Sequence, residues 1–201
     1  MHIKGPLYRS RKELDAARQA IDRMRRAQSF FEFEQAWQDY LGRVERAWNK
    51  TKDVFSEGSY VPWRGRHEHV RNSDQLLRYL KRARDAEEHT VGETISKEPG
   101  GIGINPSSGN SLYIEQMTID RGKVTIKNAK PGIAVTVFPE CAKLLPAVSR
   151  GVTTRPPEEH LGHPFSSTNP VVVAEAGLAY YEGLVKDAIT KFLLKRGRPE
   201  P

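Results

Sequence analysis

The stretch 29-SFFEFEQAWQDYLGRVERAW-48 decides the fold of this chain, because it places large apolar side chains at helical spacing. Ser29 and Glu32 have the spacing of a capping box, which predicts the start of a helix. The apolar stripe that follows consists of Phe33, Trp37, Tyr40, Leu41, Val44 and Trp48, and it continues toward Val54 or Phe55. Aromatic side chains could also stack on nucleic-acid bases, but a stripe at helical spacing is more typical of a core. We therefore expect a long core helix.

Two neighbouring segments have the same periodicity. Residues 10–27 begin with a second capping-box pair, Ser10 and Glu13, and are predicted to form a helix. Another helix is predicted from Asn72 or Ser73 to about Gly92, with an apolar stripe formed by Leu76, Leu77, Leu80 and Ala83. The intervening residues 56–72 are punctuated by glycine and proline and are rich in arginine and histidine, which predicts a loop.

The chemical character changes after Gly92. The polar stretch 97-KEPGGIGINPSSGNS-111 predicts a glycine-rich loop, and it lacks the lysine and the following helix of a phosphate-binding P-loop. The runs 111–119, 123–128 and 132–138 are β-like, and a turn signal at Asp120–Lys123 separates the first two. We expect these runs to form a three-stranded antiparallel meander.

A last helix is predicted over residues 170–197. Asn169 can cap it, Pro170 can occupy its first position, and 195-KRGR-198 ends it with positive charge. Four amphipathic helices predict an α+β protein that is mainly α, a four-helix bundle with a small antiparallel β-meander inserted before the last helix. We expect residues 1–201 to form a single domain, with the first three bundle helices in 10–95, the β-meander insert and loops in 96–169, and the final bundle helix in 170–197.

The composition limits the classes of function. The net charge is +7, and residues 1–90 hold 19 lysines and arginines against 14 acidic residues, whereas the remainder holds 13 against 11. Such an excess of positive charge favours a polyanionic partner. The alternative is a basic protein that has no polyanionic partner. No apolar run approaches the roughly 20 residues that span a bilayer, and no apolar secretory segment opens the chain, so we expect a cytoplasmic location and no membrane partner. The single cysteine, Cys141, excludes an internal disulfide and a zinc site built on cysteines.

The segment 81-KRARDAEEHTV-91, near the end of the third predicted helix, carries the candidate chemistry. At about 100° per residue, Arg84 falls on the apolar side of the helix, where a guanidinium needs an acidic partner or an anion. Glu87 is one candidate partner, and Glu88 has the i+4 spacing of an ordinary helix-surface ion pair with Arg84. His89 lies about 140° around the helix from Arg84, and Asp85, four residues before it, can orient its ring. Taken alone, His89 is a solvated or structural histidine.

The sequence Arg84-x4-His89 resembles the signature of the HEPN superfamily, an R-x4–6-H motif with a polar second residue on a helix of a four- or five-helix bundle. The resemblance covers roughly residues 10–95 and 170–196. The second residue here is Asp85, where the family more often has asparagine. The resemblance implies a metal-independent endoribonuclease that needs no cofactor, acts on RNA, and forms a homodimer whose two motifs face one cleft. Arg82 also precedes His89 at an allowed distance.

The resemblance gives each residue of the motif a role. His89 would take the proton of a ribose 2′-OH or protonate the leaving 5′-oxygen, and Arg84 would stabilise the negative charge on the phosphorane. Asp85 would orient the imidazole ring. Arg84 of one chain could then complete a site with His89 of the other. The family analogy also suggests a toxin or defence role and an antitoxin or other protein partner.

Four basic side chains are candidate contacts for RNA phosphates: Arg64, Arg66, Arg71 and Arg82. The segment of the first three also contains His67 and His69, and a second predicted loop contains His160 and His163. Histidine pairs without acidic or cysteine ligands give weak support for zinc, and nothing in the sequence brings the two loops together. We therefore expect no metal site.

Two hypotheses for the function remain. One is the composite endoribonuclease described above. The other is a non-catalytic helical-bundle module that binds a nucleic acid or a protein partner through its basic faces, with Arg84 in a structural ion pair. Cleavage of RNA in the presence of a chelator distinguishes them.

Overall fold

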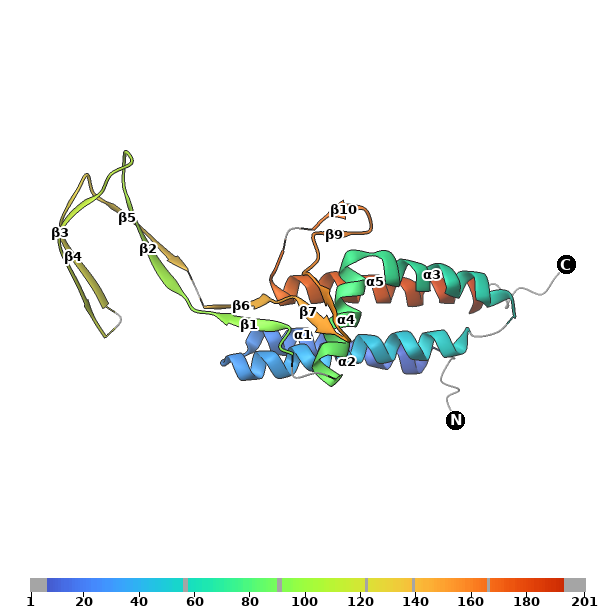
Figure 1. The fold of residues 1–201 in the computed structure, drawn as a ribbon. Helices are drawn as coiled ribbons and strands as arrows, with labels where there is room; N and C mark the ends of the chain where they lie inside the picture. The colour runs from blue at the N-terminus through green and yellow to red at the C-terminus, as the bar shows by residue number, and fades with distance from the viewer. Residues whose placement is uncertain are drawn as a thin grey trace. The chain divides into compact units, whose positions relative to one another are not determined.

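The computed structural model describes residues 7–55, 58–89, 92–121, 123–138, 140–165 and 167–193, and its architecture is mixed α+β (Figure 1). Five α-helices occur within these ranges: α1 Tyr8–Arg26, α2 Phe30–Val54, α3 Val61–Ser73, α4 Gln75–His89 and α5 Pro170–Ala188. The 3-10 turn η1 Gly58–Tyr60 precedes α3, and the π-helical turn η2 Ile189–Leu193 follows α5. None of the helices in the described ranges is long and apolar enough to cross a membrane.

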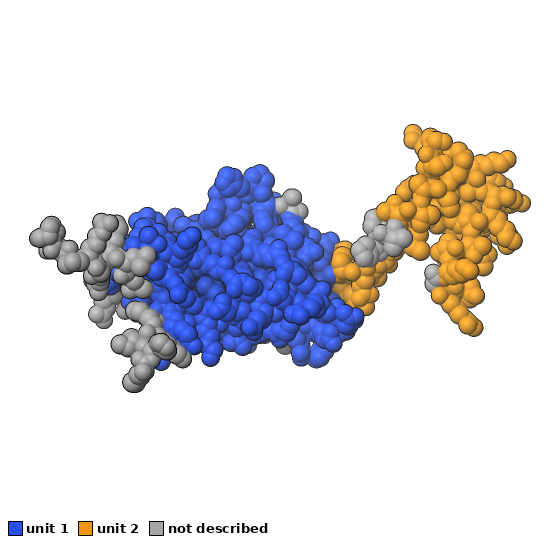
Figure 2. Space-filling view, turned by 180° about the vertical axis from the view of Figure 1, so that it is seen from behind, with its two compact units in different colours: residues 1–96, 142–201 blue, residues 97–141 orange. Residues whose placement is uncertain are grey.

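The chain divides into two compact units, which Figure 2 colours separately. Unit 1 comprises residues 1–96 and 142–201 and contains the five helices, whereas unit 2 comprises residues 97–141 and contains β-structure. From the sequence we expected residues 96–169 to hold the β-meander insert and loops. Residues 142–169 belong to the helical unit instead, because their short strands pack against α4.

Helix α2 forms the centre of unit 1, as its aromatic stripe predicts. Trp37, Tyr40 and Trp48 are almost completely buried, which confirms that the stripe is core. Ser29 caps the helix as expected, because its Oγ accepts a hydrogen bond from the backbone nitrogen of Glu32 at 3.2 Å. Helix α1 packs along α2 (Figure 1), so the first two predicted helices are both present.

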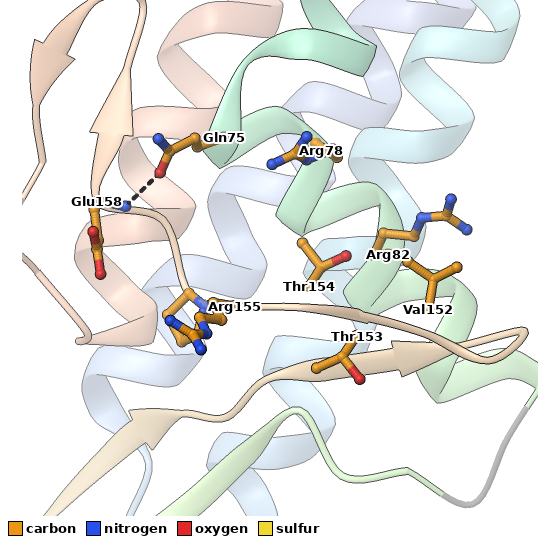
Figure 3. Close-up of a pocket in the computed structure, with 9 residues that line it drawn as sticks. Gln75, Arg78, Arg82, Val152, Thr153, Thr154, Arg155 and Glu158 are labelled. Atoms are coloured by element: carbon orange, nitrogen blue, oxygen red, sulfur yellow. Dashed lines mark hydrogen bonds between the residues drawn. The ribbon is translucent and has the colours of Figure 1, made fainter.

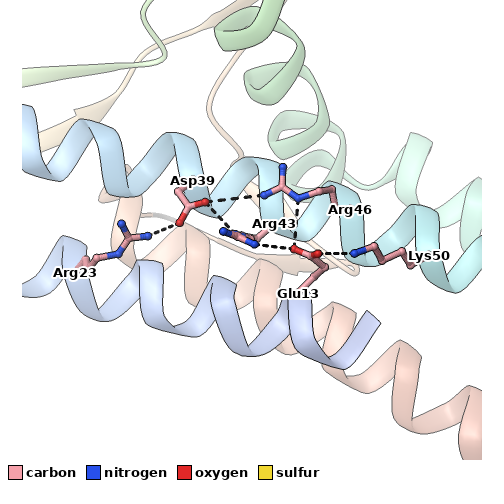
Figure 4. Close-up of polar contacts among 6 residues, drawn as sticks. All are labelled: Glu13, Arg23, Asp39, Arg43, Arg46 and Lys50. Atoms are coloured by element: carbon pink, nitrogen blue, oxygen red, sulfur yellow. Dashed lines mark hydrogen bonds and ion pairs between the residues drawn. The ribbon is translucent and has the colours of Figure 1, made fainter. Parts of the chain in front are cut away.

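A cluster of ion pairs also joins α1 to α2 (Figure 4). Glu13 of α1 is buried, and its carboxylate accepts hydrogen bonds from three cations of α2: Arg43, Arg46 and Lys50. Burial alone raises the pKa of Glu13, but the hydrogen bonds from Lys50 and Arg43 outweigh it and lower this pKa to about 2. The carboxylate therefore stays ionised between the two helices.

Helix α3 corrects the expectation that residues 56–72 form a loop, because residues 58–73 are helical. Pro62 lies in the first turn of α3, where its missing N–H costs no hydrogen bond, so it marks a helix start rather than a break. Trp63 is buried against Phe55 and Phe192, with ring centroids 5.1 Å and 5.7 Å away, and its Nε1 donates to Asp187 at 2.8 Å. Tertiary packing thus stabilises a helix whose own sequence is a weak helix former.

Helices α4 and α5 complete the core of unit 1. The predicted stripe of α4 is buried, and it consists of Leu76, Leu77, Leu80 and Ala83. Tyr40 of α2 donates a hydrogen bond to the backbone oxygen of Ala174 in α5 at 2.8 Å. A Cβ added at Gly177 would lie 2.6 Å from Tyr40 Oη and closer still to Leu80 Cδ1, so a glycine is needed where α5 approaches α2 and α4.

The start of α5 is also as predicted. Pro170 is its first residue, and the Asn169 side chain accepts a hydrogen bond from the backbone nitrogen of Val171 at 2.9 Å. The helix was expected to reach residue 197. The structure describes α5 to Ala188 and η2 to Leu193, and residues 194–197 lie outside the described ranges.

The β-structure differs from the expected three-stranded meander. Unit 2 contains β2 Gly101–Pro106, β3 Tyr113–Asp120, β4 Lys123–Lys130 and β5 Ile133–Phe138. Strand β3 pairs with β4 as predicted, but β5 pairs with β2, which arises from the stretch expected to be a glycine-rich loop. Glycines alternate with Ile102 and Ile104 in that stretch, and glycine is typical of loops, so the alternation was not interpreted as a strand.

Three more two-stranded sheets complete the described β-structure. They pair β1 Ile95–Glu98 with β6 Cys141–Leu144, β7 Ala147–Ser149 with β8 Val152–Thr154, and β9 Glu159–His160 with β10 His163–Pro164. Strands β7 and β9 pack against α4. They therefore place residues 147–164 along the helix that carries the candidate chemistry.

Candidate nucleic-acid interface

Asp74 joins the beginning of α4 to the β9–β10 hairpin. Its Oδ1 accepts a hydrogen bond from the backbone nitrogen of Leu77 at 2.9 Å, which caps the helix. The other oxygen accepts from the backbone nitrogen of Leu161 at 2.7 Å, and Nδ1 of His160 lies 3.0 Å from Oδ1. One carboxylate thus holds residues from positions 74–77 and 160–161 together.

A pocket of about 600 Å³ lies beside this junction, between α4 and β8 with the segment that follows it (Figure 3). It is lined by Gln75, Arg78, Arg82, Val152, Thr153, Thr154, Arg155, Pro156 and Glu158. Gln75, Arg78 and Arg82 occupy one face of α4, because steps of three and four residues return to the same side of a helix. Arg155 belongs to the opposite wall, where Glu158 donates its backbone N–H to Gln75 Oε1 at 3.1 Å. We call this site the arginine pocket.

The charges of the arginine pocket favour an anion. Among the described residues, Arg78, Arg82 and Arg155 have no side-chain ion pair or hydrogen bond. Glu158 is the one carboxylate of the lining, and its residue is exposed, so the lining carries three positive charges against one negative charge. Planar guanidinium groups match the oxygens of a phosphate, and the pocket has the volume of a small-ligand site.

Arg84 lies elsewhere on α4, and its charge is already paired. Its Nη1 lies 3.1 Å from Asp85 Oδ1, and its Nη2 pairs with Glu88, as the i+4 spacing predicts. The suggested pair with Glu87 does not form. Glu87 instead accepts hydrogen bonds from the backbone nitrogen of Thr94 at 3.2 Å and from Gln38 at 2.9 Å. Arg84 borders a cavity of only about 130 Å³, which is small for a nucleotide.

His89 is the last residue of α4, and its side chain lies outside the described part of the structure. Position 89 follows Arg82 by seven residues, which is nearly two full turns. Helical periodicity therefore puts position 89 on the face of α4 that carries Arg78 and Arg82, about 140° from Arg84. The structure brings Asp85 to Arg84 rather than to the arginine pocket.

The four arginines predicted to contact RNA have different environments. Arg82 lines the arginine pocket. Arg71 is 5% exposed, pairs with Glu45, and donates to Tyr181 Oη at 3.0 Å, so its side chain is part of the core and is not accessible to a phosphate. Arg64 is partly buried, with its Nε 3.9 Å from Glu68 Oε1, and Arg66 is exposed on α3.

One histidine from each predicted pair contacts the same tyrosine, a convergence that could not be predicted from the sequence. His67 Nδ1 lies 3.2 Å from Tyr180 Oη, and the rings of His160 and Tyr180 meet edge to face with centroids 6.4 Å apart. Burial raises the pKa of Tyr180 and lowers the pKa of His67. Within the described ranges no group of three or more His, Cys, Asp or Glu side chains could hold a metal ion. These histidines pack α3 and the β9–β10 hairpin onto α5.

Comparison of the chain with protein-family models, with curated proteins and with solved structures finds no match. Sequence reasoning singled out Arg82 but missed Arg78 and Arg155. The spacing of Arg78 and Arg82 was a usable signal, because both lie opposite the leucine stripe of α4. Arg155 carried no such signal, because only the folded chain brings it to α4.

Proposed function

We propose that this protein binds RNA through the arginine pocket. The observation that supports the proposal is the set of three arginines without acidic partners, which line one pocket from two segments far apart in the sequence. Arg82 is half-buried and Arg78 and Arg155 are exposed, so their guanidinium groups are accessible to a ligand, and three positive charges in one lining favour a ligand that carries several negative charges. A polynucleotide has this property, and the net charge of +7 assists its association.

Each part of the pocket suits a phosphodiester. Arg78 and Arg82 are one helical turn apart on α4, so they can contact neighbouring oxygens of one strand. Arg155 can contact the same phosphate or the next from the other wall. The hydroxyl of Thr153, which also lines the pocket, can donate a hydrogen bond to a phosphate or to a ribose 2′-OH.

Binding is tested with a fluorescent single-stranded RNA of about 12 nucleotides, a length within the range of single-strand site sizes. Arg78→Gln, Arg82→Gln and Arg155→Gln should each weaken binding about tenfold, as the loss of one charge-assisted hydrogen bond does. Each variant should also lower the slope of log affinity against log salt by about 0.7, the contribution of one phosphate contact on a single strand.

Arg121→Gln is the matched control, because Arg121 is an exposed arginine of unit 2 and its loss changes the net charge equally. It should leave the affinity within about twofold, because Arg121 does not line the arginine pocket. If all four variants weakened binding equally, the contact would be non-specific and the pocket would have no special part in it.

RNA cleavage is a second candidate function. The observation that favours it is the position of Arg82, which precedes His89 by seven residues and therefore has the R-x6-H spacing that the HEPN resemblance allows. Arg82 has no ion-pair partner among the described residues, whereas Arg84 is paired with two carboxylates. These contacts favour Arg82 over Arg84 as the arginine that acts with His89.

The chemistry would be an attack by the ribose 2′-oxygen on the adjacent phosphorus. His89 would accept the 2′-OH proton or donate a proton to the leaving 5′-oxygen, while Arg82 would stabilise the negative charge on the phosphorane. The P–O5′ bond breaks, which leaves a 2′,3′-cyclic phosphate and a 5′-hydroxyl. No metal takes part, and in the HEPN-like arrangement a homodimer would bring two such motifs together.

Cleavage is tested by incubating the protein with labelled RNA in EDTA and identifying the ends of the products. Under the cleavage proposal, the natural chain produces cyclic-phosphate ends, and His89→Ala abolishes cleavage while RNA binding persists. Activity that depends on a divalent cation or survives His89→Ala would exclude this mechanism. Binding without any cleavage would leave the protein as an RNA-binding module.

A further inference from the structure

The described side chains of unit 2 form no buried core. Among the described residues of 97–141, no side chain is buried, although the segment forms two two-stranded sheets. Its exposed large apolar side chains are Ile102, Tyr113, Met117, Ile119 and Val135. An isolated two-stranded sheet is marginally stable in water, and stability normally requires a third strand or a packed apolar face. Unit 2 therefore lacks the contacts that a β-unit of its size needs.

The register of the β3–β4 sheet gathers apolar residues on one face. Met117 lies opposite Ile126, and Ile119 lies opposite Val124, and residues directly opposite each other share a face. Met117 and Ile119 are 51% and 65% exposed. The other face carries the polar partners Thr118 with Thr125 and Gln116 with Lys127. Ile114 with Ala129 also lies on that face, so the sheet is amphipathic in its half nearest the turn, where Met117 and Ile119 are exposed.

The β2–β5 sheet has the same property. Ile104 lies opposite Val135, and Pro106 lies opposite Ile133, with Ile102 on the same face of β2 because the side-chain period of a strand is two. Val135 is 55% exposed. The opposite face carries Gly103 and Asn105. Unit 2 thus offers two uncovered apolar sheet faces.

We propose that unit 2 is a self-association module, in which these apolar faces pack against unit 2 of a second copy of the chain. The β3–β4 face and the β2–β5 face of one copy would cover those of the other, forming a small β-sandwich. Two antiparallel sheets that pack face to face through alternating apolar side chains form a common stable core.

The charge of unit 2 favours a second copy as the partner. Residues 97–141 contain five basic residues (Lys97, Arg121, Lys123, Lys127 and Lys130) and four acidic residues (Glu98, Glu115, Asp120 and Glu140). The net charge of unit 2 is therefore +1, which opposes self-association only weakly. The rest of the +7 of the chain, a charge of +6, belongs to unit 1. A polyanion is therefore attracted mainly by unit 1, and an uncovered apolar face of near-zero charge fits a partner of the same kind.

The size of the faces sets the expected strength. At about 3.3 Å per residue and about 4.8 Å between strands, the β3–β4 face spans roughly 26 Å by 10 Å and the β2–β5 face roughly 20 Å by 10 Å. Together they cover roughly 460 Å², a little over half of the roughly 800 Å² per partner of a standard interface, so the association should be weak. We therefore expect both sheets to take part and a dimer that dissociates in the micromolar range.

Sedimentation velocity of the full chain from 1 to 100 µM, a range chosen on the order of the expected dissociation constant, measures the association. The natural chain should convert from monomer to dimer across this range. Ile119→Lys and Val135→Lys each place a charge in the apolar face and should keep the chain monomeric at the highest concentration. Thr118→Lys is the matched control, because residue 118 neighbours Ile119 but lies on the other face, and it should dimerise like the natural chain.

A natural chain that stays monomeric throughout, or a dimer that Ile119→Lys and Val135→Lys leave intact, would overturn the proposal. So would an equal loss of association in Thr118→Lys.

Hydrogen exchange of the amides in residues 113–130 separates lost association from lost folding. In the natural chain, these amides should become more protected as the concentration rises, and protection that does not change with concentration would contradict the module. The RNA-binding proposal is independent of this result, because its residues lie in unit 1 and Ile119→Lys should bind RNA with unchanged intrinsic affinity.

Discussion

Nη1 of Arg84 lies 3.1 Å from Oδ1 of Asp85, and Nη2 of the same arginine pairs with Glu88. The family resemblance gives Arg84 and Asp85 separate catalytic roles, but in this structure they neutralise one another within one turn of α4. Arg82, two residues earlier, has no ion pair among the described residues and faces the arginine pocket. Of Arg82 and Arg84, Arg82 is therefore the one whose charge a phosphate can reach.

The first prediction compares these two arginines. Arg82→Gln should weaken RNA binding about tenfold. Arg84→Gln should change RNA binding less than about twofold, because it removes ion pairs with Asp85 and Glu88 and no contact with a phosphate. Fluorescence anisotropy with one RNA at one salt concentration measures both. The reverse order of effects would place the phosphate contact at Arg84 and restore the original assignment of the motif.

The second prediction concerns Glu13 and pH. Its folded-state pKa of about 2 is below the ordinary value of 4.5, so the ion pairs stabilise the fold fully above pH 4.5 and lose their effect as the pH falls toward 2. Glu13→Gln should lower the unfolding free energy at pH 7 by about 2 kcal/mol, less than the pKa shift alone suggests because its cationic partners are partly exposed. Urea denaturation at pH 7 and pH 3 measures this.

Glu182→Gln is the control for Glu13. Glu182 also forms an ion pair, with Arg18, but both side chains are exposed. Its substitution should cost less than about 1 kcal/mol at pH 7. The difference between the natural chain and Glu13→Gln should shrink at pH 3, and a difference that stays constant would exclude the ionised carboxylate as its cause.

The third prediction uses two glycines of α5. Gly177→Ala should destabilise the protein by about 1–3 kcal/mol, because its Cβ would collide with Leu80 and Tyr40 in a packed core. Gly183→Ala should stabilise it by about 0.5–1 kcal/mol, because nothing lies within 4 Å of the added carbon and alanine is the better helix former. Relative to the natural chain, the melting temperature should therefore fall in Gly177→Ala and rise in Gly183→Ala. Equal shifts would mean that α5 does not approach α2 and α4 this closely.

The fourth prediction concerns Arg71. Arg71→Met should lower the unfolding free energy by about 3 kcal/mol, because it leaves Glu45 and Tyr181 without their buried partner. The double variant Arg71→Met/Glu45→Met should recover part of that loss, since it removes the unpaired carboxylate as well. RNA affinity per folded molecule should be unchanged in both. A loss of RNA affinity without a loss of stability would show that Arg71 contacts the ligand.

The helices with strong apolar periodicity could be predicted from the sequence. The apolar stripes of α2 and α4 and the cap formed by Asn169 are marked in the sequence by residues at most four apart, so local spacing identifies them. Helix α3 could not be predicted in this way. Trp63 is buried by Phe55 and Phe192, and the second contact comes from more than 120 residues farther along the chain.

The candidate site shows the same division. Arg82 could be predicted because it lies on a recognisable helix near His89. Arg155 could not, because its approach to α4 depends on Asp74 and on the pairing of Glu158 with Gln75, contacts that span more than 80 residues. In unit 2 the β3–β4 pairing was predicted, but the pairing of β5 with β2 was not. Apolar alternation identifies a strand but does not specify which of several similar strands it joins.

The two walls of the arginine pocket come from segments about 75 residues apart, joined through Asp74. A ligand that contacts Arg78 and Arg155 together would close a long loop of the chain, and so it binds the folded state and not the unfolded one. By mass action, a ligand at 100 times its dissociation constant adds about 2.7 kcal/mol to the unfolding free energy. The melting temperature of the protein is thus itself a ligand assay, which can screen RNAs, nucleotides and other polyanions without any label.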